Sequence, residues 1–248
     1  MNPVLLITGG GRGIGAATAL LAAQRGYAVA VNYASNSLAA DEVVRTIRDG
    51  GGTAIAVQAD VGNEAQVMSM FEKIDAKLGR LTALVNNAGV VDVQARVDEM
   101  SVARLERMFR INVIGSFVCA REAVRRMSTK HGGAGGAIVN ISSGAARLGS
   151  PGQYVDYAAS KAAIDTLTIG LAKEVAEEGI RVNAVRPGLI DTEIHASGGM
   201  PDRAVELAPT VPMKRTGSPE EIAGAILWLL SAEASYTTMA LLDVTGGR

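Results

Sequence analysis

Tyr157 and Lys161 are a tyrosine and a lysine four positions apart, at the start of a segment with helical spacing. Side chains at this separation lie on one face of a helix, so the phenol and the ammonium group are neighbours. A phenol gives or takes a proton, and a nearby positive charge favours its ionised form. The pair predicts acid–base chemistry, although this spacing arises by chance about 0.1 times in such a chain.

Hydroxyl and amide side chains end two apolar runs upstream of this pair. Residues 138–141 lead into Ser142 and Ser143, and residues 83–85 lead into Asn86-Asn87-Ala88-Gly89, a tetrapeptide expected by chance only about 0.006 times. Ligands bind at the carboxyl ends of the strands in parallel sheets. We therefore expect both segments to lie at the same ligand-binding edge.

A glycine-rich segment joins the first expected strand to the first expected helix. It reads Thr8-Gly9-Gly10-Gly11-Arg12-Gly13-Ile14-Gly15. Without a Cβ the backbone can turn tightly, and a pyrophosphate can approach the helix N-terminus, whose N–H groups and dipole attract anions. The segment predicts a dinucleotide site; a glycine turn that serves only the backbone is the alternative.

The second expected strand lacks the acidic side chain that an NAD site usually offers. Such a site places Asp or Glu about 20 residues beyond the glycine loop to bind the ribose 2′-hydroxyl. Here the sequence is Asn32-Tyr33-Ala34-Ser35-Asn36, and the next carboxylate, Asp41, falls inside the following helix. Arg12 offers a guanidinium for a 2′-phosphate. We therefore expect the protein to prefer NADP(H). The alternative is NAD(H), in which case Arg12 would be a solvated charge in the loop.

Short apolar runs alternate with segments of helical spacing along the chain. We expect seven strands, at residues 4–8, 28–33, 53–58, 83–86, 137–142, 181–185 and 239–244. Helices are expected at residues 16–25, 38–49, 64–78, 101–130, 157–178 and 219–230. This alternation predicts an α/β fold with a doubly wound parallel seven-stranded sheet, a Rossmann fold, in a single domain of residues 1–248.

The least regular segment, residues 191–217, follows the carboxyl end of an expected strand. We expect it to form a substrate loop or lid. His195 within it would touch the substrate or be a solvated loop residue. With this segment, Val93, Gln94 and Tyr154 are expected to set specificity by their shape.

Charge and composition exclude several kinds of partner. Twenty-four Lys and Arg balance 25 Asp and Glu, for a net charge of −1, so nucleic acid and membrane are not expected partners. The single cysteine, Cys119, excludes an intrachain disulfide, and two distant histidines, His131 and His195, predict no metal site. The apolar run at residues 4–7 is too short for a signal peptide, so we expect a cytoplasmic location.

Taken together and in order, these motifs resemble the short-chain dehydrogenase/reductase family along essentially the whole chain. The matching pieces are Thr8 with residues 9–15, Asp60-Val61, Asn86 to Gly89, Asn112, Ser143, Tyr157 with Lys161, and Pro187-Gly188 with Thr192. The resemblance implies an enzyme that depends on NAD(P).

By this resemblance, the candidate catalytic residues are Asn112, Ser143, Tyr157 and Lys161. Tyr157 would be the acid/base, and Lys161 would lower its pKa and bind the ribose. Ser143 would bind the substrate carbonyl, and Asn112 would belong to a proton relay.

The segment from Ser143 to Tyr157 is one residue longer than the family's commonest spacing. This leaves Ser142 as an alternative to Ser143, which we choose because it is the second serine. Tyr154 cannot replace Tyr157, because Ala158 rather than lysine stands four residues beyond it.

The candidate cofactor-binding residues lie on several loops at the expected edge of the sheet. They are Gly9, Arg12, Gly13, Ile14, Gly15, Asn32, Ser35, Asp60, Val61, Asn87, Ala88, Gly89, Tyr157, Lys161, Pro187, Gly188, Ile190 and Thr192. The resemblance implies that Asp60 and Val61 touch adenine, that residues 87–89 line the cofactor, and that residues 187–192 hold the nicotinamide end.

The expected function is NADP(H)-dependent hydride transfer between nicotinamide and a carbonyl or secondary alcohol of a small substrate. One alternative is a non-enzymatic NADP-binding sensor or scaffold, which would not need the intact proton-transfer groups. The other is a 3-oxoacyl-[acyl-carrier-protein] reductase. We rank it lower because the expected helix after Tyr157 ends in the acidic stretch 174–178, which would repel an acidic carrier.

Two expected helices, residues 101–130 and 157–178, carry more apolar faces than one sheet can cover, with Val113, Phe117 and Ile169 among their side chains. The resemblance adds that such helices pair across a two-fold axis. We expect a homotetramer or a homodimer.

Overall fold

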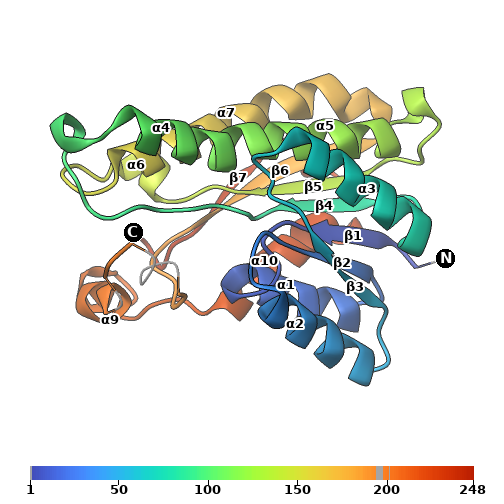
Figure 1. Ribbon diagram of the computed structural model, residues 1–248, viewed down its shortest axis with the longest axis horizontal. Coiled ribbons are helices and arrows are strands. Elements are labelled where there is room, and N and C mark those ends of the chain that lie inside the picture. Colours follow the sequence, from blue (N-terminus) through green and yellow to red (C-terminus); the bar gives the residue numbers. More distant parts are fainter. Residues whose placement is uncertain (1, 194–197, 201) are drawn as a thin grey trace.

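The strands form one parallel sheet in the computed structural model, which describes residues 2–193, 198–200 and 202–248 (Figure 1). Over these residues the sheet has seven strands in the order β3-β2-β1-β4-β5-β6-β7. The strands are β1 (Val4–Ile7), β2 (Ala28–Tyr33), β3 (Ala54–Gln58), β4 (Ala83–Asn86), β5 (Gly136–Ile141), β6 (Ile180–Pro187) and β7 (Leu241–Val244). The expected doubly wound Rossmann fold is confirmed.

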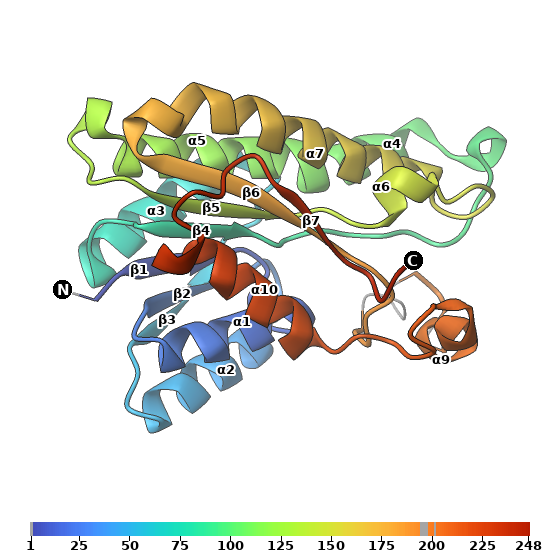
Figure 2. The ribbon, with the colours of Figure 1, turned by 180° about the vertical axis from the view of Figure 1, so that it is seen from behind.

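Helices cover both faces of this sheet (Figures 1 and 2). One face carries α1 (Gly13–Gln24), α2 (Ser37–Asp49) and α10 (Pro219–Leu230); the other carries α3 (Glu64–Leu78), α4 (Val102–Phe109), α5 (Gly115–Met127) and α7 (Val155–Val175). Two short helices, α6 (Ala145–Leu148) and α9 (Arg203–Leu207), lie beyond one end of the sheet. Among the helices described, none is long and apolar enough to cross a membrane.

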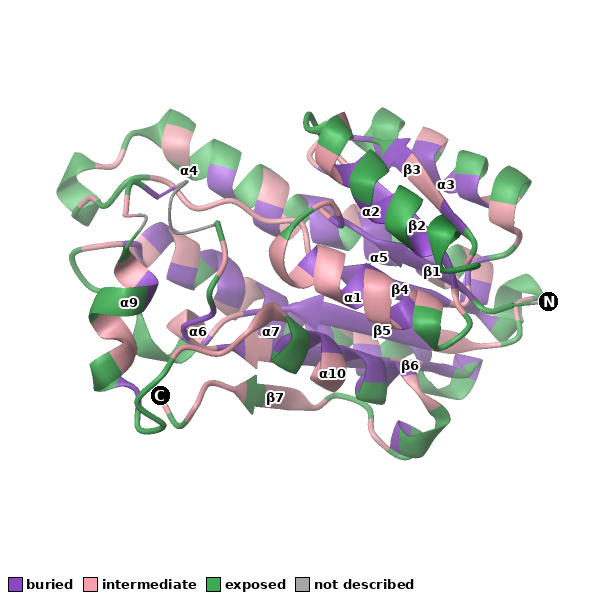
Figure 3. Ribbon diagram, turned by 90° about the horizontal axis from the view of Figure 1, so that it is seen from below, coloured by how far each residue is buried: buried purple, intermediate pink, exposed green. Residues whose placement is uncertain are grey.

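The core consists of two apolar layers, one on each face of the sheet. Along β1, Leu5 and Ile7 pack toward α1 and α10, whereas Val4 and Leu6 pack toward α3 and α5. Figure 3 shows the inner strands largely buried, the edge strand β7 partly exposed and the outer helix surfaces exposed. Because both faces of each inner strand are covered, the strands are continuous apolar runs rather than alternating ones.

The expected helix at residues 101–130 differs from the structure. A π-helical turn, Arg110–Ile114, separates α4 from α5, and α5 ends at Met127, before a 3₁₀ turn at Thr129–His131. At the start of α5, the hydroxyl of Ser116 donates back to the carbonyl of Asn112 in the π turn (3.1 Å). A π turn adds one residue to a helical repeat, which periodicity alone does not show.

Element ends also shift. Helix α1 begins at Gly13 rather than residue 16, and α7 begins at Val155 rather than residue 157. Strand β7 begins at Leu241 rather than residue 239, because Met239 has a φ of 66° and so leaves the extended conformation. Each shift stays within three residues, so the strand ends that build the site are where the sequence predicts them.

Candidate active site

A cleft of about 680 Å³ lies at the carboxyl edge of the sheet. The connections that follow strands β1 to β6 all contribute to its lining. Of the candidate catalytic residues, Ser143, Tyr157 and Lys161 line the cleft, whereas Asn112 does not. Of the cofactor candidates, Gly15 is the one that is absent from the lining.

Two glycines of the loop stand where there is no room for a side chain. Gly9 has a φ of 62°, and a Cβ on it would meet the Ala88 Cα at 3.1 Å. A Cβ on Gly15 would meet the Gly9 carbonyl oxygen at 2.4 Å. Gly15 therefore lies behind the cleft wall, where it permits the close packing that shapes the loop.

The N-terminus of α1 is open to an anion. Its N-cap residue, Arg12, makes no side-chain cap hydrogen bond, and the first turn contains no acidic residue. The N–H groups and the positive end of the helix dipole therefore face the cleft without a counter-charge from this helix. The loop fits a dinucleotide pyrophosphate, because glycines leave space where it would approach.

Two asparagine side chains hold the glycine loop in place. The Asn87 amide donates to the carbonyls of Thr8 (2.9 Å) and Gly9 (3.0 Å). The Asn32 oxygen accepts from the Gly9 N–H (3.1 Å), and its amide donates to the Ala59 carbonyl (2.9 Å). Both residues line the cleft, but their amides form hydrogen bonds within the protein. Their role is therefore to hold the glycine loop in its conformation.

The end of β2 places no carboxylate in the cleft. Asn36 caps α2 by accepting from the Ala39 N–H (3.1 Å), while Ser35 lines the cleft. The Arg12 side chain lies on the same wall, 59% exposed, and forms a long ion pair of 3.8 Å with Glu193. Its guanidinium is thus accessible on this wall.

Lys161 is buried, and Tyr157 is half-buried in the wall of the cleft. The Lys161 ammonium donates to the Ile141 carbonyl (2.8 Å) and lies 5.6 Å from the centre of the Tyr157 ring. Burial lowers the pKa of Lys161 to about 8, against the opposing charge of Asp165. Burial raises the pKa of Tyr157, and the hydrogen bond that lowers it comes from Ser143. The lowering expected from Lys161 and the charge of an oxidised nicotinamide stays a prediction.

Two neighbouring serines have different surroundings. The Ser142 hydroxyl is buried and donates to the Lys161 carbonyl (3.1 Å). The Ser143 hydroxyl accepts from the Ala145 N–H (3.1 Å) and hydrogen-bonds with the Tyr157 side chain. Of the two hydroxyls, that of Ser143 is next to the phenol.

Asn112 lies behind the cleft wall. Its side-chain oxygen accepts from the Val90 N–H (2.8 Å), and its amide donates to the Val90 carbonyl (3.0 Å) and the Ser160 hydroxyl (3.1 Å). Ser160 in turn donates to the Tyr157 carbonyl (2.7 Å). The Asn112 side chain thus ties the loop after β4 to the first turns of α7.

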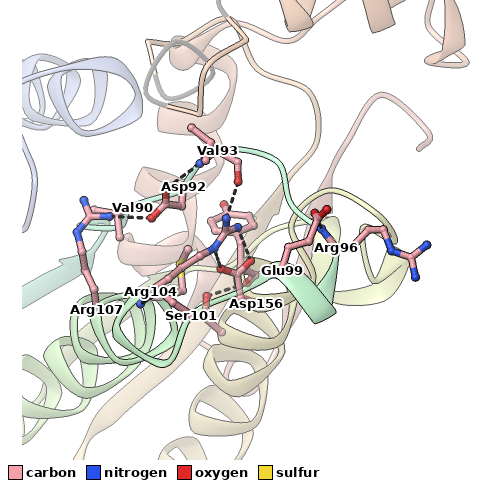
Figure 4. Close-up of polar contacts among 12 residues, drawn as sticks. Val90, Asp92, Val93, Arg96, Glu99, Ser101, Arg104, Arg107 and Asp156 are labelled. Carbon is pink, nitrogen blue, oxygen red and sulfur yellow. Dashed lines mark hydrogen bonds and ion pairs between the residues drawn. The ribbon is translucent and has the colours of Figure 1, made fainter.

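A buried ion pair supports the same region (Figure 4). Arg104 of α4 donates to both carboxylate oxygens of Asp156, at 2.8 and 3.2 Å, and to the Val93 carbonyl at 2.7 Å. The two charged side chains are only 9% and 0% exposed. Arg104 therefore holds the residue next to Tyr157 and one end of the loop after β4. Sequence reasoning missed this pair, because its members are 52 positions apart.

Further cleft residues were also missed. Gly144, Leu148, Ser150, Arg203, Thr245 and Arg248 line the cleft, and their types gave no signal in the sequence. Tyr154 lines it as expected, whereas Val93 and Gln94 do not. His195 lies outside the described residues. Among the residues that the structure describes, no three His, Cys, Asp or Glu side chains are grouped to hold a metal ion.

The same architecture occurs in a solved short-chain type dehydrogenase/reductase from Mycobacterium marinum. That structure superposes with a TM-score of 0.92 at 37% identity, covering 99% of this chain and 94% of that chain. The sequence profile of the family described as Enoyl-(Acyl carrier protein) reductase matches residues 9–248. The chain belongs to the short-chain dehydrogenase/reductase family.

Short-chain dehydrogenase/reductase relatives match almost end to end. An uncharacterised oxidoreductase, YgfF, of Escherichia coli (strain K12) is 57% identical over 99% of both chains. A 3-oxoacyl-[acyl-carrier-protein] reductase of Synechocystis sp. is 40% identical over 98% of this chain and 96% of its own. The protein is an oxidoreductase of this family, which acts on CH–OH groups and binds NAD(P)(H).

The buried ion pair yields a stability prediction. Asp156→Leu leaves Arg104 buried without its partner, and we expect the free energy of unfolding to fall by about 3–5 kcal/mol in urea denaturation. Arg104→Met combined with Asp156→Leu should recover much of this loss, because it removes the unpaired charge. The control Asp92→Asn, which weakens the more exposed pair with Arg107, should cost less than about 1 kcal/mol. A double variant less stable than the single one would contradict this account.

Proposed function

We propose that this protein is an NADP(H)-dependent oxidoreductase that interconverts the carbonyl and the secondary alcohol of a small substrate. The observation that supports this best is the grouping of Tyr157, Ser143 and Lys161 in one cleft with the glycine loop. Hydride transfer to a carbonyl requires a proton donor beside a dinucleotide site.

The cofactor would occupy the wall formed by the glycine loop and the ends of β2 to β6. Backbone N–H groups at the start of α1 would bind the pyrophosphate, Asp60 and Val61 would touch the adenine, and residues 87–89 and 187–192 would hold the nicotinamide half. When bound, NADP(H) supplies or accepts the hydride. Arg12 would pair with the 2′-phosphate, since residues 32–36 contribute no negative charge that would repel it.

Tyr157 would move the proton. Its raised pKa keeps the phenol protonated at neutral pH, which suits an acid that donates to the oxygen of a carbonyl under reduction. The Ser143 hydroxyl, beside the phenol, would position that oxygen. Lys161 would bind the ribose and, in its charged form, favour the phenolate when the reaction runs toward oxidation.

Residues 191–217 would act as the substrate lid of a single domain spanning residues 1–248. A short parallel bridge between Ile190 and Gly217 joins the two ends of this segment, and its helix α9 borders the cleft. Thr192 and Glu193 at the start of the segment, and Arg203 of α9, line the cleft.

A 3-oxoacyl-[acyl-carrier-protein] reductase is the second candidate, favoured by the relative of that name in Synechocystis. An acidic carrier would need free basic residues. Arg121, Arg125 and Arg126 of α5 instead pair with Glu64, Glu122 and Asp75 at 2.7–2.8 Å. We therefore favour small free substrates. A cytoplasmic location, and the absence of nucleic-acid and membrane partners, stay predictions from the sequence.

Tyr157→Phe tests the proposed acid. The change removes the hydroxyl and keeps the ring, so we expect kcat with a ketone substrate to fall at least about a hundredfold. Circular dichroism and NADPH binding should stay close to those of the parent protein. Tyr154→Phe is the matched control, which we expect to change KM more than kcat, because its hydroxyl donates to the Gly198 carbonyl in the cleft wall (3.4 Å). Near-full turnover in Tyr157→Phe would overturn the assignment.

Arg12→Ala tests the cofactor preference. Loss of the guanidinium should weaken NADPH binding by about 1–3 kcal/mol, or about five- to 150-fold, with a smaller effect on NADH. Fluorescence titration of the reduced cofactors measures both affinities. Arg25→Ala, an exposed arginine at the far end of α1, is the control. Equal affinity of the parent protein for the two cofactors would refute the preference.

We expect a homotetramer, with a homodimer as the alternative. Exposed apolar side chains follow one face of α4, the π turn and α5, including Val102 (68% exposed), Ile114 (55%) and Phe117 (50%). Light scattering at micromolar concentration should give four times the chain mass of 25.6 kDa. Phe117→Asp should shift the mass downward, whereas Met68→Asp on α3 should not. A monomeric parent protein would contradict the proposal.

A further inference from the structure

Arg203 is a cation held in the substrate part of the cleft. It lies on α9 and lines the same cleft as Tyr157 and Ser143. Its guanidinium carbon is 5.1 Å from the centre of the Tyr154 ring, which is buried. One N–H donates to the Gln153 side-chain oxygen (2.8 Å), and another approaches the Met200 sulfur (3.8 Å). The stacking and the hydrogen bond fix the plane of the guanidinium.

The charge of Arg203 is not balanced within the described part of the chain. No carboxylate there lies within ion-pair distance of it. The acidic side chains in the cleft lining interact elsewhere: Asp60 accepts from the Gly62 N–H (2.9 Å), and Glu193 pairs with Arg12. By contrast, Arg215 on the same segment is paired with Glu221 at 2.7 Å.

An arginine fixed in this way has donors left for a ligand. A guanidinium carries five N–H groups in one plane, and the contacts with Gln153 and Met200 use two of them. The remaining N–H groups match the planar geometry of a carboxylate or the oxygens of a phosphate. A neutral ketone or alcohol would leave this charge without a partner.

We propose that Arg203 binds an anionic group, a carboxylate or a phosphate, on the substrate, and that the enzyme acts on small oxo or hydroxy compounds that carry such a group. This inference rests on the proposed oxidoreductase function.

Matched pairs of substrates test the proposal. The pairs are 4-oxopentanoate with its methyl ester, and dihydroxyacetone phosphate with dihydroxyacetone, each assayed with NADPH by absorbance. We expect the anionic member of the carboxylate or the phosphate pair to have a KM at least about tenfold lower than its neutral partner. The pair that shows the difference identifies the anionic group.

Variants assign the difference to Arg203. Arg203→Met should remove the preference by raising the KM of the anionic member about 10- to 100-fold, and Arg203→Lys should retain part of it. Lys214→Met is the matched control, because this lysine carries the same charge in the same segment but donates to the Pro209 carbonyl and does not line the cleft. The control should keep the preference.

The possible failures are distinguishable. If the parent protein reduces the neutral members as well as the anionic ones, the oxidoreductase function stands and the anion site is wrong. If Arg203→Met changes the KM of both members equally, Arg203 supports the lid and does not bind the anion, and the proposal is overturned. If no member of either pair is reduced, the inference is overturned, whereas the oxidoreductase function is judged by the Tyr157→Phe test.

Discussion

The close contact between the loop after β1 and the loop after β4 determines the layout of the whole cleft. Gly9, Gly15 and Asn87 lie so near each other that any Cβ on Gly15 would meet the Asn87 amide at 2.7 Å. The amide of Asn87 bridges the two loops with two hydrogen bonds. This contact sets the position of the α1 N-terminus, and with it the place where an anion can bind.

Proton chemistry depends on a second constraint, the burial of Lys161 and the partial burial of Tyr157 in the cleft wall. Burial opposes charge on either group, so it raises the pKa of the phenol and lowers that of the ammonium. The two pKa values, which lie close together for the free side chains, are thereby moved apart, so at neutral pH the phenol is protonated and the ammonium is charged. In this setting the Ser143 hydroxyl is the polar group that favours the phenolate.

The sequence was informative where the structure follows local rules. Strands buried on both faces must be apolar runs, so β1, β4 and β5 and the residues that follow them could be located by pattern. Family resemblance added the grouping of Ser143 with Tyr157. Contacts between distant positions gave no comparable signal: nothing in the spacing of Arg104 and Asp156 predicts that they form a buried pair. The motif also shows the charged neighbour of Tyr157 but not the burial that raises the pKa of its phenol.

The bridge between Ile190 and Gly217 brings together the two ends of the intervening segment, the 26 residues 191–216, at the edge of the sheet. Once the ends of a loop are fixed, adding or removing residues between them changes the entropy of closure only slowly with length. Changes in the length of this segment should therefore have little effect on the stability of the sheet and the glycine loop. Evolution can remodel the part of the fold that selects the substrate while the part that performs the chemistry is inherited intact.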